Sequence, residues 1–244
     1  MNLLRRLFAD RIPSPSGYSG SLLLVLLAVA LPWSDARAIS GCMLGAVNQV
    51  AAPGPGGTAN FTISIDDMSG CTGANGTIAI TSNTTGGGSV STPTFSGGLN
   101  AIIPFSMTAG TTPGTMEVTV TCTSGCSGGS TLLFQASTHT YQLLQASPPL
   151  VRVQPNTPTT IQARALRNGS PLSGVSVGYD LSGPMGAILT PPIAVTDGGG
   201  LATQQFQAPT IGSYSLDGSY CMPDLTAGMG CVPVNTSFTV LVLS

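Results

Sequence analysis

Six cysteines and one histidine are the residues of this chain whose side chains could do chemistry. Cysteines that follow an export signal form disulfides far more often than metal sites, and a mixed zinc site would also need nearby histidines. The one histidine, His139, stands apart from the cysteines in the alternating run Thr138–Tyr141. We therefore expect three disulfides, no metal site and no cofactor, from Cys42, Cys71, Cys122, Cys126, Cys221 and Cys231.

The position of each cysteine suggests its partner. Cys221 and Cys231 are the only two in the second half and flank the loop between its last two expected strands. Cys122 and Cys126 flank the equivalent, shorter loop of the first half. Four cysteines allow three pairings, and Cys122 has the opposite strand phase from Cys221, so the other two pairings of the first half stay open. The favoured pairs are Cys221–Cys231, Cys122–Cys126 and Cys42–Cys71.

A serine hydrolase is the one enzyme class that a sequence string suggests. Residues 125–129 (GCSGG) match G-x-S-x-G, and His139 is the only candidate base. The string needs a sharp strand-to-helix turn, whereas here it lies in a glycine-rich hairpin beside an expected disulfide. We therefore expect His139 to be a solvent-facing strand residue and the protein not to be an enzyme.

Aspartates could bind calcium, as they do in some extracellular sandwiches. Asp66, Asp67 and Asp197 are the candidates, but no Asp-x-Asp-x-Asp ladder of ligands surrounds them. Asp is also a favoured turn residue, because its side chain accepts hydrogen bonds from nearby backbone N–H groups. Turn and capping roles are the expectation.

The composition indicates an all-β protein. The 244 residues include 32 Gly and 19 Pro with few aromatics, which suits many short strands and turns. Only 7% of the residues are charged and none is Lys, so Ser, Thr, Asn, Gln and Gly must form the surface. A disordered chain would carry more charge and less hydrophobicity.

Residues 1–38 have the features of a cleaved signal peptide. Arg5, Arg6 and Arg11 precede the apolar run 22–31, which is too short to span a bilayer permanently, and Ala36-Arg37-Ala38 fits a cleavage site. Two alternatives stay open: the Arg pair suits a twin-arginine signal, and residues 39–42 (ISGC) resemble a lipoprotein box that would lipidate Cys42. Lipidation would leave an odd number of cysteines, so we favour general secretion.

The mature chain is weakly acidic. Cleavage after Ala38 leaves three arginines against six aspartates and one glutamate, a net charge of −4. Nucleic acids and anionic membranes both require clustered Arg or Lys. We therefore expect neither as a partner, and no integral membrane segment in the mature chain.

The rest of the chain has the pattern of a duplicated unit. Residues 75–80 match 173–177, and 114–118 match 212–216, both at an offset of 98; Gly97–Phe105 matches Gly199–Phe206 at 101 to 102. A spacing of about 100 residues is the size of one β-sandwich. We predict one domain over 39–147 and a second over 148–244, joined by a stiff proline-containing linker at 145–149.

Period-two alternation identifies the strands and their inward faces. The expected core residues of the first unit are Phe61, Ile63, Ile65, Met116, Val118, Val120 and Cys122. Those of the second unit are Tyr214, Leu216, Gly218, Tyr220, Val232, Val234, Phe238, Val240 and Val242.

The turns of the second unit have a counterpart in a known family. Residues 168–177 (NGSPLSGVSV) are followed by a Thr-Asp-x-x-Gly turn at 196–200 and by the strand sequence GSYSL at 212–216. This order resembles the bacterial immunoglobulin-like domain of the invasin and intimin type, over about Pro149–Ser244. The resemblance implies an extracellular seven-stranded sandwich that serves as a spacer or adhesive module, with no catalytic residues.

Two tandem immunoglobulin-like β-sandwiches behind a signal peptide are thus the expected architecture. The leading hypothesis is an exported bacterial structural or adhesive protein, located in the periplasm, on the cell surface or outside the cell. Its partners would be other surface or extracellular proteins, or further copies of itself. The alternative is a carbohydrate- or protein-binding module that acts through loops at one end of a sandwich, and an enzyme would rest on His139 alone.

Overall fold

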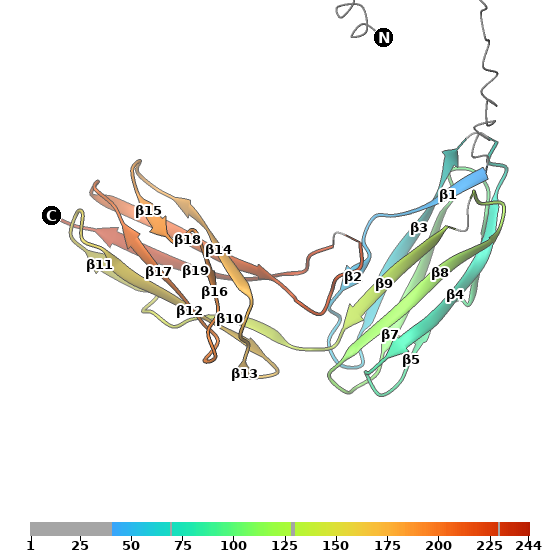
Figure 1. Cartoon of the computed structure of the whole chain (residues 1–244), viewed down its shortest axis with the longest axis horizontal. Coiled ribbons are helices and arrows are strands. Elements are labelled where there is room, and N and C mark those ends of the chain that lie inside the picture. The colour runs from blue at the N-terminus through green and yellow to red at the C-terminus, as the bar shows by residue number, and fades with distance from the viewer. Residues whose placement is uncertain (1–40, 69, 128–129, 229) are drawn as a thin grey trace, which may run out of the picture. The chain divides into compact units, whose positions relative to one another are not determined.

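The computed structural model describes residues 41–244 except 69, 128–129 and 229, so the predicted signal peptide lies outside the described residues. All regular structure in the described part is β-strand (Figure 1). In that part the structure contains no helix of the length and hydrophobicity needed to cross a membrane. The strands form four sheets, which pack in pairs around two separate hydrophobic cores.

The first sandwich consists of two sheets whose strand orders are β1-β3-β7-β5 and β2-β9-β8-β4-β6. β2 runs parallel to β9, and every other pairing is antiparallel. The strands are β1 (Gly41–Ala46), β2 (Val50–Ala51), β3 (Thr58–Met68), β4 (Ala74–Asn83), β5 (Gly88–Val90), β6 (Thr94–Gly97), β7 (Ile102–Ala109), β8 (Thr115–Ser124) and β9 (Thr131–Ser137).

The second sandwich repeats this arrangement, with sheets β10-β12-β17-β15 and β11-β19-β18-β14-β16 and a short β13 paired to β12. β11 runs parallel to β19 as β2 does to β9. The strands are β10 (Tyr141–Gln145), β11 (Leu150–Val153), β12 (Thr159–Arg167), β13 (Ser170–Pro171), β14 (Ser176–Ser182), β15 (Ile188–Thr190), β16 (Ile193–Val195), β17 (Leu201–Gln207), β18 (Gly212–Cys221) and β19 (Pro233–Val242).

The identical strand orders support the predicted duplication. Val118 faces Phe134 across β8 and β9, and Leu216 faces Phe238 across β18 and β19, so the offset of 98 holds for β8 and β18. The offset at the first landmark is different. Val120 of β8 pairs with Ile78 of β4, and Gly218 of β18, 98 residues after Val120, pairs with Tyr179 of β14. Ile78 and Tyr179 are therefore equivalent positions, at an offset of 101. Two antiparallel sandwiches of this topology confirm the all-β, tandem immunoglobulin-like fold class.

The alternating residues of the long strands form the two cores, as predicted. In the first, Phe61, Phe105 and Phe134 pack as an aromatic triad with ring centroids 4.9 to 5.6 Å apart, within the range in which aromatic pairs attract. In the second, Tyr214 packs edge-on against Phe206 at 5.3 Å. Val232 is the exception among the predicted core residues: it precedes β19 and is only half-buried.

The predicted linker at 145–149 is a strand crossing inside the second sandwich. Gln145 ends β10 in one sheet and Leu150 begins β11 in the other, while the backbone N–H groups of Ala146 and Ser147 donate to Gln162. The two prolines therefore mark a change of sheet, for which they are suited because they need no ladder hydrogen bond. The chain passes between the two cores earlier, between Ser137 and Tyr141. That each sandwich folds as an independent domain stays a prediction.

Candidate functional site

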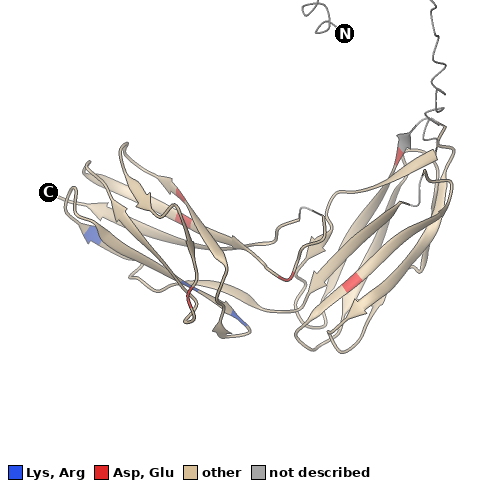
Figure 2. Cartoon of the chain, in the orientation of Figure 1, with Lys and Arg blue, Asp and Glu red and all other residues tan. Residues whose placement is uncertain are grey.

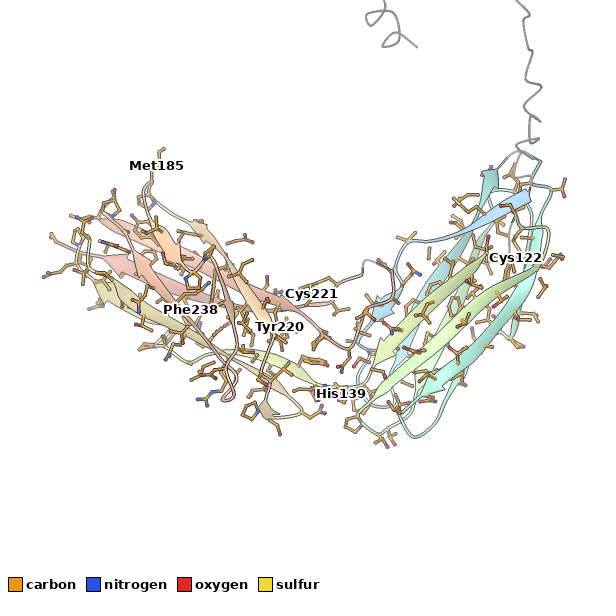
Figure 3. All side chains as sticks on the ribbon, in the orientation of Figure 1. Cys122, His139, Met185, Tyr220, Cys221 and Phe238 are labelled. Atoms are coloured by element: carbon orange, nitrogen blue, oxygen red, sulfur yellow. A yellow bond between two sulfur atoms is a disulfide. The ribbon has the colours of Figure 1, made fainter. Side chains whose placement is uncertain are left out.

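His139 lies in the short connector between β9 and β10 and not within a strand. Its side chain is only 17% exposed, so the expectation of a solvent-facing strand histidine is wrong. The cause is tertiary, because residues from the β12–β13 turn and the β18–β19 loop lie against the ring. Figure 3 shows His139 at the point where the chain leaves the first sandwich.

Asn168 fixes the orientation of the His139 ring. Asn168 and Gly169 form the two-residue turn between β12 and β13, with φ of 52° and 77°, a conformation that Asn-Gly adopts with little strain. The Asn168 side-chain oxygen accepts a hydrogen bond from the backbone N–H of Thr140 at 2.9 Å. Its amide nitrogen is therefore the group 2.8 Å from His139 Nδ1, so Nδ1 accepts and a neutral ring carries its proton on Nε2.

Asp224 collects three donors on the other side of the ring. His139 Nε2 lies 3.4 Å from its carboxylate and Arg167 Nη1 lies 3.2 Å away, while the Tyr141 hydroxyl donates a hydrogen bond to it. Burial, strengthened by the hydrogen bond to this carboxylate, raises the pKa of the Tyr141 phenol. The phenol therefore stays a donor at neutral pH.

The hydrogen bonds and ion pairs of this cluster hold the connector against two loops, and they do not form a catalytic dyad. Both ring nitrogens of His139 face Asn168 and Asp224, which leaves neither for a serine nucleophile. The nearby Ser137 hydroxyl accepts a hydrogen bond from the His139 backbone N–H at 3.2 Å. Through these partners, His139 ties the connector to two loops of the second sandwich.

Gln135 of β9 makes a second set of contacts to the β18–β19 loop. Its side-chain oxygen accepts hydrogen bonds from the backbone N–H groups of Thr226 and Ala227 at 2.6 and 2.7 Å. Its amide nitrogen donates to Glu117 at 2.8 Å, and the residue is 4% exposed. A buried glutamine that satisfies two consecutive backbone donors holds the loop against β9, because leaving those donors unpaired would be costly.

All six cysteines are paired in the three disulfides that the sequence favours. Cys221–Cys231 closes the loop that contacts Gln135, with Cα atoms 5.3 Å apart. Cys122–Cys126 and Cys42–Cys71 have Cα separations of 6.2 and 4.6 Å. Because its sulfur is bonded to Cys71 in the structure, Cys42 cannot there carry the lipid of a lipoprotein.

The remaining candidate residues are dispersed over the fold. Ser127, of the hydrolase-like string, donates its backbone N–H to Cys42; residues 128–129 lie outside the described residues. The register of β8 and β9 places that string and His139 at opposite ends of the first sandwich, as the positions of Cys122 and His139 in Figure 3 illustrate. Asp197 accepts hydrogen bonds from the N–H groups of Gly199 and Leu201, which is the expected turn role. Asp66 accepts a hydrogen bond from Ser64.

Charged groups are sparse over both sandwiches (Figure 2). Among the described residues, no three side chains of His, Cys, Asp or Glu gather as metal ligands would. No pattern in the sequence predicted the contacts of Asp224, Asn168 and Gln135. Only Asn168 carries a local signal, the Asn-Gly turn, while Asp224 meets Tyr141 and Gln135 meets Thr226 across more than 80 residues of chain.

Comparison with known proteins gives structural likeness without sequence support. No protein-family model and no curated protein matches the chain. The similar solved structures include the D0–D1 domain of intimin, with 14% identity, 83% of this chain and 100% of that chain covered, and a TM-score of 0.32. They also include the adhesin InvE of Yersinia pseudotuberculosis, with 16% identity, 82% and 58% covered, and a TM-score of 0.29.

A third similar structure contains the fibronectin(III)-like modules of Clostridium thermocellum CbhA, with 13% identity, 82% and 94% covered, and a TM-score of 0.39. Intimin is one of the two proteins that typify the family resembled by the turn pattern at 168–216. At such scores the likeness carries no argument about function, and the sandwich assignment rests on the observed strand order.

Proposed function

We propose that the chain is an exported, non-enzymatic spacer or subunit of a bacterial surface or extracellular assembly. The observation that supports this most directly is the pairing between an early strand and the last strand of each sandwich. In both sandwiches, a strand close to the entry point of the chain lies parallel and hydrogen-bonded to the last strand. In the second sandwich, where the parallel pairing spans four residues, this geometry suits a module that bears tension.

In the second sandwich the parallel pair is formed by β11 and β19. Leu150 to Val153 lie beside Thr239 to Val242, and the flanking bonds run from Thr239 N to Pro149 O at 3.0 Å and from Leu243 N to Val153 O at 2.9 Å. When the N-terminal end of β11 is pulled against the C-terminal end of β19, the two parallel strands are sheared along their length. All their hydrogen bonds are then loaded together, whereas a peeled hairpin loses one pair at a time.

In the first sandwich the parallel pair is short, and a disulfide protects it. β2 pairs with β9 over two residues only. Cys42 near the start of β1 is bonded to Cys71 beyond β3, so tension entering at Cys42 passes directly to Cys71. Residues between them, including β2, are bypassed while the bridge is intact. Oxidised thiols therefore suit a load-bearing role outside the cytoplasm.

Two experiments test the proposal. Cell fractionation with mass measurement of the mature N-terminus should find the protein beyond the inner membrane and cleaved after Ala38. In single-molecule pulling, handles at the chain ends should give a higher unfolding force for the second sandwich than handles at Ile211 and Ser244. The latter pair peels β18 from β19, because Gly212 faces Val242 at the end of that hairpin. A cytoplasmic protein, or equal forces in the two geometries, would refute the proposal.

A second candidate function, binding through loops at one sandwich end, is supported by the loops beside β15 and β18. Met185 is 86% and Ile211 55% exposed, and the Thr210 hydroxyl donates to Met185 O, which holds the two loops together. Figure 3 shows Met185 projecting from the second sandwich. Two exposed apolar side chains on adjoining loops would offer a partner a small apolar contact. A glycan and protein array probed with wild type and the Met185→Asp variant tests this, and identical profiles would dismiss it.

A further inference from the structure

One stretch of β19 has an edge without a strand partner. β18 pairs with all of β19, from Pro233 to Val242, whereas β11 pairs only with Thr239 to Val242. The N–H groups of Thr239 and Leu243 point toward β11. Because the backbone groups of successive residues in a strand point to opposite sides, those of Asn235 and Ser237 point to the same side as those of Thr239. Within the described residues, no strand is hydrogen-bonded to this edge segment, although β10 of the other sheet lies next to it and contacts it through Gln145.

A glutamine side chain takes the place of the strand at one position. The Gln145 amide, at the end of β10, donates a hydrogen bond to the backbone oxygen of Ser237. The first sandwich has a similar contact, from Gln49 to the backbone oxygen of Leu133 at 2.8 Å. Leu133 precedes Phe134 as Ser237 precedes Phe238, so the two acceptors are equivalent in the duplicated fold, although Gln49 lies just before β2 and Gln145 at the end of β10. Covering an edge in this way opposes unwanted strand addition.

Beside the β19 edge, the outer face of the sheet is hollowed and acidic. The hollow holds about 520 Å³ and is lined by residues of β14, β18 and β19. Asp180 pairs with Asp217, and Asp217 pairs with Ser237, so these three form one row across the sheet. Two carboxylates directly opposite each other repel. Both are exposed, and the two ion pairs found among the described residues use Asp224 instead.

We propose that this edge binds an extended segment of a partner protein as an added strand, with Arg or Lys at an alternate position. An added strand lies about 4.8 Å from β19, so its outward side chain beside Ser237 starts about 10 Å from Asp217. An arginine or lysine side chain covers much of that distance, and the small Ser237 leaves room for it to cross. There it neutralises the repulsion between Asp180 and Asp217, while main-chain hydrogen bonds replace the Gln145 contact.

The equivalent row in the first sandwich provides an internal control. It consists of Ala79, Thr119 and Leu133, which carry no charge. The strand edge and its glutamine are present there, but the acidic hollow is not. We therefore assign the binding of a basic strand to the second sandwich alone. The inference rests on the proposed extracellular role, since the partner would be another exported protein.

Selection from a random dodecapeptide phage library on the full, disulfide-bonded chain tests the proposal. The enriched peptides should be rich in β-branched residues with Arg or Lys at alternate positions. Asp180→Asn/Asp217→Asn should weaken their binding about tenfold, the loss expected for two partly exposed ion pairs, and raised salt should do the same. Both substitutions are isosteric and exposed, so an unchanged urea midpoint will show that the variant is folded.

Two glutamine variants give the matched comparison. Gln145→Ala should tighten binding several-fold because the incoming strand no longer displaces a hydrogen bond, whereas Gln49→Ala should change nothing. Hydrogen exchange should show that the bound peptide protects the Asn235 and Ser237 amides. The inference is overturned by a selection that enriches no basic peptides, or by enriched peptides that bind Asp180→Asn/Asp217→Asn as tightly as wild type. Either result leaves the fractionation and pulling tests of the spacer role unaffected.

Discussion

Reduction of the disulfides should lengthen the fully extended first sandwich by about 11 nm. Cys42 and Cys71 are 29 residues apart in sequence, and an extended chain spans about 3.3–3.6 Å per residue. The bridge therefore hides about 10 nm of chain, after subtraction of the 4.6 Å already spanned by its Cα atoms. Cys122 and Cys126 are four positions apart in sequence, so their bridge adds about 1 nm. Both lengths follow from the pairing alone.

Single-molecule pulling of the oxidised and reduced chains measures this difference directly. Either of the other two pairings would place about 80 residues of the first sandwich behind the bridges, so reduction would release about 28–30 nm. The second sandwich provides an internal length standard, because its two bridged cysteines are ten positions apart in sequence and their reduction releases about 3 nm. Cys42→Ser/Cys71→Ser should lengthen the chain by about 10 nm without reductant. A release near 28 nm, or none, would contradict the pairing and the bypass of β2.

Three further predictions concern the second sandwich. Asp224→Ala should lower its free energy of unfolding in urea by about 2–3 kcal/mol, because the buried Tyr141 phenol loses its charged acceptor and the ion pair with Arg167 is lost. The control Asp217→Ala, at an exposed site, should change this free energy by no more than about 0.5 kcal/mol. Equal losses in the two variants would refute the role of the cluster. Burial raises the pKa of Tyr179 and of Tyr220 to about 12, against about 10 in an unfolded chain. The unfolded chain therefore loses protons first, so this stability is complete below pH 10 and falls as pH rises toward 12; the urea midpoint of the first sandwich, which contains no tyrosine, should show no such fall. Truncation at Asn235 removes most of the strand that closes the second core, and should abolish soluble expression; a protease-resistant product would contradict this.

Strand positions and inward faces could be predicted because they depend on local pattern. Tyr214, Leu216 and Tyr220 alternate with polar residues, and a period of two allows only one face of β18 to be buried. The Asn168-Gly169 turn could be predicted for the same reason, since positive φ at both positions favours that pair. These choices are made within a few residues of chain and need no knowledge of distant partners.

The boundary between the sandwiches could not be predicted in the same way. The two prolines before Leu150 suit an interdomain linker and a change of sheet equally well, because both leave the backbone N–H unpaired. Only the pairing of Tyr141–Gln145 with Ala163–Arg167 shows that the second sandwich has already begun. The burial of His139 could not be predicted for a related reason. The run around it alternates as an exposed strand would, but Asn168 and Asp224, which bond to its two ring nitrogens, lie far from that run in sequence.

The sequence by itself determined the all-β class and the core-facing residues, and it favoured a duplication and one set of disulfide pairs, because alternation, turn chemistry and cysteine count are local or countable properties. Only the tertiary structure shows that Asp224 binds His139 of the connector, that Gln135 accepts hydrogen bonds from the β18–β19 loop and that Gln145 donates to the edge of β19. Each of these is one polar side chain meeting a group 80 or more residues away. A single long-range hydrogen bond leaves no periodic trace in the sequence, so it becomes visible only once the sheets have placed its two ends together.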